Sequence, residues 1–314
     1  MFSEHQPAID LVIPVFNEAG VVEQTHAGIC TVIDGLPHKF TIFYVNDGSN
    51  DDTAQCLAAL AEADKRIVVL ELARNFGHQA ALTAGLDASR ADFVISMDGD
   101  GQHPPEMIPE MIDLFKQGYD IVQTQRIGEG SRFSFKKMTS SAFYALINRI
   151  SGTRILPGAA DFRGMSRQVV EALKSMPEYH RFLRGMISWV GYRSVILPYH
   201  ETRRVAGESK YSLGKMFRLA MDAIFSFSLM PLYIGLSAGG VFFCLAALEM
   251  VYVLSFWVTG RTSSLAPGWS SLMFVILIVS GIIMILLGFI GVYVGYIFQE
   301  VKRRPVYLLK KGKE

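Results

Sequence analysis

The sequence predicts an α/β protein with a doubly wound, mostly parallel sheet, followed by an interfacial helix and two transmembrane helices. Between residues 10 and 126, short apolar runs rich in β-branched and aromatic residues alternate with helical patterns, which is typical of βαβ units. Toward the C-terminus, two long segments carry almost no charge. They explain why the chain is 50% hydrophobic, with a mean hydropathy of +0.28.

Five strands are expected from the apolar runs, over 10–15, 40–46, 67–72, 93–97 and 120–124. Helical patterns lie between and after them, over 19–34, 51–63, 77–89 and 105–117. The right-handed crossover rule then places helices on both faces of the sheet. Asp51 or Asn50 is expected to be the N-cap of the second helix, because the side-chain oxygen of either residue can accept hydrogen bonds from the free N–H groups of a first turn.

Two uncharged segments are each long enough to cross a bilayer, over 229–257 and 272–298. The alternative is a buried helical hairpin of a soluble protein. Basic residues flank the pair on both outer sides, whereas the loop between the segments carries only Arg261. The positive-inside rule therefore predicts a multi-pass protein of the inner (plasma) membrane, with both chain ends and the catalytic domain in the cytosol.

The expected organisation is a cytosolic α/β domain over 1–211, an interfacial amphipathic helix over 212–228, a hairpin over 229–298 and a basic tail over 299–314. A helix docked on the cytosolic domain is the alternative for 212–228. Each span contains a Gly-x-x-x-Gly pattern, at Gly235 to Gly239 and at Gly291 to Gly295. Such spacing allows close helix contacts, so a homo-oligomer through the membrane helices is possible.

Several classes of protein are excluded by composition and motifs. The formal net charge is +1, which gives no reason to expect nucleic-acid binding. The three cysteines lie far apart without a Cys-x-x-Cys pair, which disfavours a disulfide framework or a cysteine zinc site. The sequence has neither a P-loop nor a Gly-x-Gly-x-x-Gly segment after the first strand, and its histidines show no recognised metal spacing.

Polar residues follow each expected strand at the point where it ends. The carboxyl ends of parallel strands share one edge of a sheet, where α/β proteins bind ligands. These residues are therefore expected to converge on one rim: Asn17, Glu18, Asp47, Arg74, Asn75, Asp98, Asp100, Gln102 and Arg126.

The turn at 98–105 carries the most specific chemistry. Asp98 and Asp100 are separated and followed by glycines, so both carboxylates can point at one cation. Ligand sets made only of oxygen suit Mg²⁺ or Mn²⁺. A cation here could neutralise a diphosphate and assist its departure. The neighbouring His103 is expected to be structural.

Four segments, in this order, resemble family 2 glycosyltransferases of the GT-A fold: Pro14-Val15-Phe16-Asn17-Glu18, Asn46-Asp47-Gly48-Ser49-Asn50-Asp51, Arg74-Asn75-Phe76-Gly77 and Asp98-Gly99-Asp100-Gly101-Gln102. Segments at 161–167, 181–185 and 204–211, with the two spans and the ending at 300–307, narrow the resemblance to polyprenyl-phosphate glycosyltransferases. These include bactoprenol glucosyl transferases and dolichol-phosphate mannose synthases.

The resemblance implies roles for individual residues. Asp47 would contact the nucleoside, and Pro14, Asn17 and Glu18 lie in the matching nucleotide-pocket motif. Asp98 and Asp100 would serve the metal and the diphosphate, Gln102 would line the sugar site, and Arg126 and the 204–210 segment would handle phosphates. Two positions depart from the pattern: Asn46 replaces a frequent Asp, and Tyr296 replaces a usual Arg.

The implied activity is inverting transfer of a hexose, glucose from UDP-glucose by subgroup, to a polyprenyl (undecaprenyl) phosphate. Asp161 is expected to be catalytic or positioning, with a structural pair to Arg163 as the alternative. Arginine suits phosphate recognition, so the acceptor-site candidates are Arg163, Arg181, Arg184, Arg204, Ser209 and Lys210.

Two other functions are kept open. One is a processive polysaccharide synthase, although Arg126 lacks the following Trp of the usual Gln-x-x-Arg-Trp motif. The other is a membrane protein that binds a nucleotide sugar without catalysis, which the presence of Asp98, Asp100 and Asp161 argues against.

Overall fold

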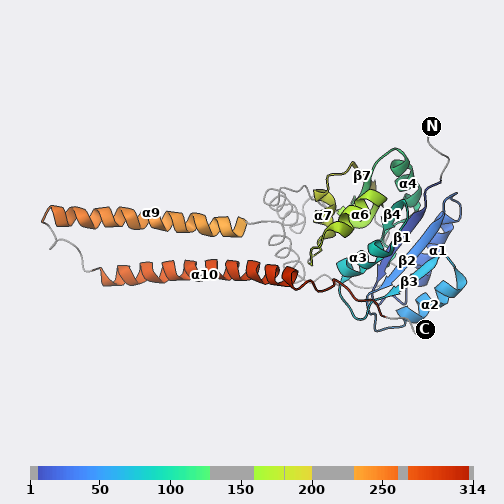
Figure 1. Ribbon diagram of the computed structural model, residues 1–314, viewed down its shortest axis with the longest axis horizontal. Coiled ribbons are helices and arrows are strands. Elements are labelled where there is room, and N and C mark those ends of the chain that lie inside the picture. Colours follow the sequence, from blue (N-terminus) through green and yellow to red (C-terminus); the bar gives the residue numbers. More distant parts are fainter. Residues whose placement is uncertain (1–5, 128–158, 180, 200–229, 261–267, 311–314) are drawn as a thin grey trace. The chain divides into compact units, whose positions relative to one another are not determined.

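The computed structural model describes residues 6–127, 159–179, 181–199, 230–260 and 268–310 (Figure 1). The chain divides into two compact units. The first joins the N-terminal domain to the segment that begins at Arg304, and the second is the helical hairpin. The expected interfacial helix at 212–228 lies outside the described residues.

A seven-stranded sheet forms the centre of the first unit, in the order β3-β2-β1-β4-β6-β5-β7. Neighbouring strands pair in parallel, except that β6 runs antiparallel to both β4 and β5. The five strands expected from the sequence are present, with ends shifted by at most two residues, which confirms the α/β prediction. The strands are β1 (Ile9–Val15), β2 (Phe40–Asn46), β3 (Ile67–Glu71), β4 (Phe93–Ser96), β5 (Ile121–Arg126), β6 (Ala159–Ser166) and β7 (Ser194–Tyr199).

Helices pack against both faces of this sheet. On one face, α1 (Val22–Ile33), α2 (Thr53–Ala63) and α4 (Ile108–Lys116) join their apolar residues to the inward side chains of β1 and β2 in the main core. On the other face lie α3 (His78–Ala88) and α6 (Arg167–Ser175). A short 3₁₀ turn, η1 (Pro105–Met107), leads into α4, and α7 (Leu183–Trp189) precedes β7.

Strands β6 and β7 are absent from the sequence prediction. The pattern of β6 is not apolar, because Asp161 and Arg163 lie in the middle of the strand and pair with each other at 2.6 Å. Gly164 lets β6 pass close to the ring of Phe93 on β4, where any larger side chain would collide. A buried charge pair therefore takes the place of an apolar pair, and hydropathy alone does not reveal the strand.

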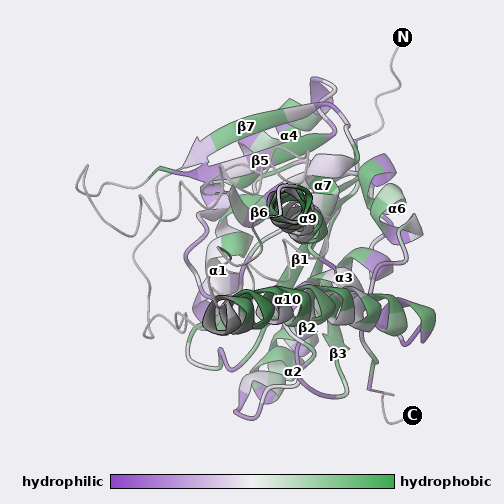
Figure 2. Cartoon of the chain, turned by 90° about the vertical axis from the view of Figure 1, so that its left-hand side faces the viewer, coloured by the Kyte–Doolittle hydropathy of each residue, from purple (hydrophilic) through white to green (hydrophobic). Residues whose placement is uncertain are grey.

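The second unit is a pair of long helices, α9 (Met230–Val258) and α10 (Trp269–Val301), which run side by side (Figure 1). Segments Gly235–Phe256 and Ile278–Val301 are long and apolar enough to cross a membrane. Figure 2 shows apolar residues along both helices. Gly235 packs against the side chain of Leu286, so this glycine serves contact within the hairpin.

The segment after α10 returns to the first unit and extends the sheet beyond β3. Leu309 forms an antiparallel bridge with Leu72, and backbone hydrogen bonds flank it on both sides. The Tyr307 hydroxyl donates to Asp87 Oδ2 at 3.0 Å. Residues 307–310 are thereby held against the edge of the sheet, next to the loop at 73–77 that follows β3.

Candidate active site

Three strand ends, those of β1, β2 and β4, lie next to one another in the sheet and carry the polar rim. Asn17, with a φ of 55°, accepts a hydrogen bond from Asn50 N at 2.9 Å and donates its own N–H to Ser49 Oγ at 3.0 Å. These bonds join the loops after β1 and β2. The nearby Pro14 lies within β1, paired in register with Val45.

The next residue of the rim, Glu18, is fixed by its backbone, which donates to Thr53 Oγ1 at 2.9 Å. Asp51 accepts from both the N–H and the hydroxyl of Thr53, the first residue of α2. The N-cap residue of α2 is Asp52, whose side chain makes no capping bond, so the prediction of an N-cap at Asp51 or Asn50 is wrong by one or two residues, although Asp51 still accepts the first N–H of the helix. Asn46, which replaces a frequent Asp, accepts from Ser49 N at 3.0 Å and so stabilises the same turn.

Asp47 is buried and links two loops of the rim. Its carboxylate accepts hydrogen bonds from Phe76 N at 2.7 Å and Gly77 N at 2.9 Å. Gly48 has a φ of +65° and lies so close to the backbone of 74–75 that a side chain there would collide. Burial raises the pKa of Asp47, with the two N–H donors opposing the change. Each carboxylate oxygen keeps a second lone pair, so a ligand hydroxyl can still donate to it.

The Asp98–Asp100 turn follows β4 and rests on a buried histidine. His103 Nδ1 accepts the N–H of Asp98 at 2.9 Å, and its ring stacks on Phe162 at a centroid distance of 5.1 Å. Burial lowers the pKa of His103, which keeps the ring neutral. Gln102 N donates to Asp100 Oδ1 at 3.1 Å. His103 therefore supports the turn, in agreement with its expected structural role.

The donor set of this turn fits a hard divalent cation. Asp98 Oδ1 is buried yet makes no hydrogen bond. The side chain as a whole is 35% exposed, and the His78 imidazole approaches this oxygen only to 3.5 Å, so a cation bound here would satisfy it better. Together with Asp100, Asp98 presents only oxygen ligands, which Mg²⁺ and Mn²⁺ prefer.

Asp161, on β6, is the centre of a buried ionic cluster. Arg163 Nη2 contacts its Oδ1 at 2.6 Å, and Arg184 of α7 binds both oxygens, each at 3.0 Å. Burial alone would raise the pKa of Asp161, but the charges of Arg184 and Arg163 and a contact from His78 hold it well below its usual range. The side chain is therefore ionised and already strongly bonded. The pair with Arg163, given above as the alternative to a catalytic or positioning role, is present as part of a larger cluster.

His78 was not singled out from the sequence. It is the first residue of α3, and its Nε2 lies 3.3 Å from Asp161 Oδ2 and 3.5 Å from Asp98 Oδ1. Partial burial works against the imidazolium, but Asp161 and Asp98 outweigh it and raise the pKa of His78. His78 thus connects the Asp98–Asp100 turn to the ionic cluster around Asp161. The available signal was its position directly after the Arg74–Gly77 motif, at the rim.

Some of the remaining predicted residues lie within the described part of the chain, and others lie outside it. Arg126 ends β5, where it is paired in register with Tyr199. Arg181 Nη2 donates to Met176 O at 2.8 Å, so this guanidinium stabilises its own loop. Arg204, Ser209 and Lys210 lie outside the described residues, and Tyr296 lies within α10.

Comparisons with known proteins agree with this arrangement. Residues 10–174 match the sequence profile of glycosyl transferase family 2. The chain is 39% identical over 308 residues to the SfII prophage-derived bactoprenol glucosyl transferase of Shigella flexneri, covering 97% of this chain and 98% of the relative. It is 38% identical over 302 residues to an uncharacterised glycosyltransferase of Bacillus subtilis, YkcC, covering 96% and 93%.

Among solved structures, mannosyl-3-phosphoglycerate synthase from Rubrobacter xylanophilus has a similar fold, with a TM-score of 0.51 and 18% identity over 69% of this chain and 72% of that one. At this identity the likeness concerns the fold alone. The sequence match and the full-length relatives go further. They show that the chain belongs to glycosyltransferase family 2.

Proposed function

We propose that this protein transfers a hexose from a nucleotide sugar to a polyprenyl phosphate, with glucose and UDP-glucose as the first choice of sugar and donor. The names of the bactoprenol glucosyl transferase relatives support the acceptor class and the sugar. The UDP donor rests on the resemblance of the sequence to that subgroup.

The observation that carries this proposal is the state of Asp161. A sugar hydroxyl acceptor has to lose a proton during attack, and its enzyme benefits from a base with a pKa near the working pH. Asp161 is a poor base, because two arginines hold it ionised. A phosphate monoester has a second pKa near 6, so it is mostly a dianion at neutral pH and needs no base. The cluster therefore suits a phosphate acceptor.

Within this scheme Asp161 positions cations. It fixes Arg184 in a bidentate contact and holds Arg163, which is 2% exposed, at the edge of the rim. Arg184 is partly exposed, and a guanidinium presents five N–H donors in a planar fork, a geometry that suits an anionic oxygen beside Asp161. Arg204, Ser209 and Lys210 remain predicted acceptor ligands, and Arg126 a predicted phosphate ligand.

On the donor side, Asp98 and Asp100 would hold Mg²⁺ or Mn²⁺, which supplies positive charge against the leaving diphosphate when bound. Asp47, with the loop of Asn17 and Glu18, would bind the nucleoside, and Gln102 would contact the sugar. An acceptor oxygen attacks the anomeric carbon as the bond from that carbon to the diphosphate oxygen breaks. Direct displacement inverts the configuration, so an α-linked donor gives a β-linked product.

The long apolar helices α9 and α10 would anchor the protein in the bilayer, where a lipid acceptor diffuses in two dimensions at high effective concentration. We place both chain ends in the cytosol, because basic residues follow α10 and one arginine lies between the helices. Labelling of a cysteine introduced at Lys310 checks this. Reaction with an impermeant reagent only from the outside would refute the orientation.

The function is tested with a panel of nucleotide sugars and undecaprenyl phosphate in detergent, with the lipid analysed by mass spectrometry. We expect one hexose added per lipid phosphate, with UDP-glucose as the best donor. A polymer would indicate a processive synthase, and no transfer from any donor would indicate a binding protein.

Arg184→Gln and a matched control sharpen the test. Arg184→Gln should lower transfer about tenfold or more, since a hydrogen bond to a charged group contributes about 1.5–3 kcal/mol. Arg193→Gln is the control, because Arg193 stacks on Tyr119 at 4.3 Å from the ring, away from the cluster. Equal rates in both variants would contradict the assigned role of Arg184.

A further inference from the structure

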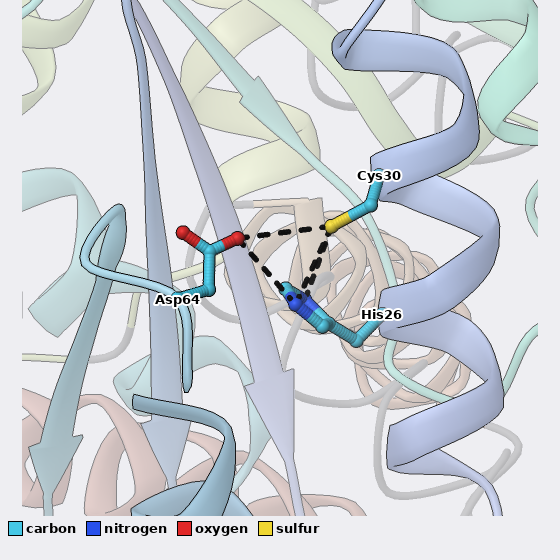
Figure 3. Close-up of side chains that lie close together, drawn as sticks. All are labelled: His26, Cys30 and Asp64. Atoms are coloured by element: carbon cyan, nitrogen blue, oxygen red, sulfur yellow. Dashed lines mark hydrogen bonds and ion pairs between the residues drawn. The ribbon is translucent and has the colours of Figure 1, made fainter. Parts of the chain in front are cut away.

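A second group of potential ligands lies where α1 meets the junction of α2 and β3 (Figure 3). His26 and Cys30 are four residues apart on α1, so their side chains leave the same face of that helix. Asp64 follows α2, shortly before β3 begins, at the opposite end of that strand from the rim. Figure 3 shows the imidazole, the thiol and one carboxylate oxygen pointing toward one another.

The distances within this group match those of a tetrahedral metal site. Cys30 Sγ lies 3.4 Å from His26 Nε2 and 3.8 Å from Asp64 Oδ2, and His26 Nε2 lies 3.6 Å from the same oxygen. Typical bond lengths from Zn²⁺ to sulfur, nitrogen and oxygen give ligand–ligand distances of roughly 3.4–3.6 Å in a tetrahedron. Small side-chain shifts would therefore place all three atoms at bonding distance from one ion.

Two of the three potential ligands, His26 and Asp64, are oriented by neighbouring side chains. The Tyr44 hydroxyl lies 3.3 Å from His26 Nδ1, which leaves Nε2 as the nitrogen that faces the sulfur and the carboxylate. Arg66 donates from Nε to both oxygens of Asp64, each at 3.0 Å. Such outer contacts fix histidine and carboxylate ligands in known metal sites.

The charges of the group can balance. Arg66 Nη1 pairs with Asp34 at 2.6 Å, a carboxylate outside the group. On binding, the Cys30 thiol exchanges its proton for the metal, and the proton passes to solvent. One thiolate and one carboxylate then offset a divalent ion. Burial raises the pKa of the Cys30 thiol, and the charge of Arg66, whose Nη2 lies 3.4 Å from the sulfur, opposes this rise.

We propose that His26, Cys30 and Asp64 bind a divalent ion of intermediate softness, Zn²⁺ in the cell, with water as the fourth ligand. The ion would link α1 to the segment that starts β3. This mixed set of nitrogen, sulfur and oxygen ligands favours Zn²⁺ over the harder ions Mg²⁺ and Mn²⁺, which suit the carboxylates of Asp98 and Asp100. Sequence spacing alone does not reveal this site, because the third ligand, Asp64, lies in the segment between α2 and β3. The proposal is independent of the transferase activity.

The test is a Co²⁺ titration of the full chain in detergent, after chelator treatment and dialysis. We expect one equivalent to produce a thiolate-to-Co²⁺ charge-transfer band in the near ultraviolet and intense visible bands of tetrahedral Co²⁺. One equivalent of Zn²⁺ should abolish both. These signals report on the unmutated protein, so they do not depend on any variant folding. Their absence would overturn the proposal.

Variants assign the band to Cys30. Cys30→Ser should remove the charge-transfer band, whereas Cys56→Ser, a matched half-buried cysteine on α2 that contacts Ala19 O, should keep it. Asp98→Asn should also keep it, which separates this site from the predicted Mg²⁺ or Mn²⁺ site. Tyr44→Phe should weaken binding about tenfold to a hundredfold. A band that survives in Cys30→Ser, or disappears in Cys56→Ser, would refute the assignment.

Discussion

Asp161→Asn removes one negative charge and almost preserves the shape of the side chain. In the native protein this carboxylate is 7% exposed and bonds Arg163 and Arg184. In the variant, Arg163 stays buried while both guanidiniums lose their anionic partner. Removing one member of a buried ion pair costs about 3–5 kcal/mol. That is a large part of the roughly 5–15 kcal/mol that stabilises a typical folded domain.

The expected result is a lower melting temperature of the domain. One kcal/mol corresponds to about 2–4 °C for a domain of this size, so Asp161→Asn should lower the Tm by roughly 6–20 °C. Thermal unfolding followed by circular dichroism measures it. The control is Asp113→Asn, because Asp113 is 67% exposed and its 3.6 Å pair with Lys116 lies on the surface of α4. Such pairs contribute about 0–1 kcal/mol. Similar melting of both variants would refute a stabilising role for the cluster.

The pH dependence of this difference tests the ionised state of Asp161. The pKa of Asp161 is held below its usual range in the folded protein, so its stabilising effect is fully present above the unfolded value near 3.9. It is lost only as the pH falls below that value, toward the folded pKa. Asp161 itself stays ionised from pH 8 to pH 5, so the Tm difference between wild type and Asp161→Asn should not shrink as the pH falls over this interval. It should widen toward pH 5, because Asp161 also stabilises the protonated form of His78. A difference that shrinks over this interval would show that Asp161 takes up a proton there.

Three further changes probe the rim and the end of the chain. Asp98→Asn should cut transfer at least about a hundredfold, because it removes charge that holds the metal, and excess EDTA should do the same to the wild type; wild-type turnover in both cases would remove the metal assignment. His78→Gln should lower kcat about tenfold or more with little change in donor KM, because the variant loses the imidazole that contacts both Asp98 and Asp161. An effect on KM alone would place His78 in donor binding. Tyr307→Phe should destabilise the domain by about 0.5–1.5 kcal/mol, measured in urea, through loss of its bond to Asp87; an unchanged midpoint would show that the bond contributes nothing.

The first five strands could be predicted because each is an apolar run whose burial is visible in the sequence. The rim residues Asn17, Asp47 and Asp98 could be placed for a related reason: parallel strands put their carboxyl ends together. Neither inference needs any contact between distant parts of the chain. Local pattern and one topological rule were sufficient.

The ionic cluster needed long-range information. Asp161 reaches the rim only because β6 inserts between β4 and β5, antiparallel to both, and the charges in that strand hide it from a hydropathy pattern. The role of His78 could not be predicted for the same reason, because this residue contacts Asp98 and Asp161, which belong to two other segments of the chain. The bridge between Leu72 and Leu309 likewise joins positions that are separated by both long helices.

Charge at the rim explains why residues beyond the ionic cluster are needed for the proposed reaction. The carboxylates of Asp98, Asp100 and Asp161 and the guanidiniums of Arg163 and Arg184 together leave one negative charge, or none when His78 is protonated. A divalent cation changes this to one or two positive charges. The diphosphate of the donor and a phosphate monoester bring about four negative charges between them at neutral pH. The cluster cannot neutralise both substrates, so further cations have to approach once they are bound. Arg126 and the basic segment that contains Arg204 and Lys210 are the candidates in this sequence, which is the physical reason to keep them as predicted phosphate ligands.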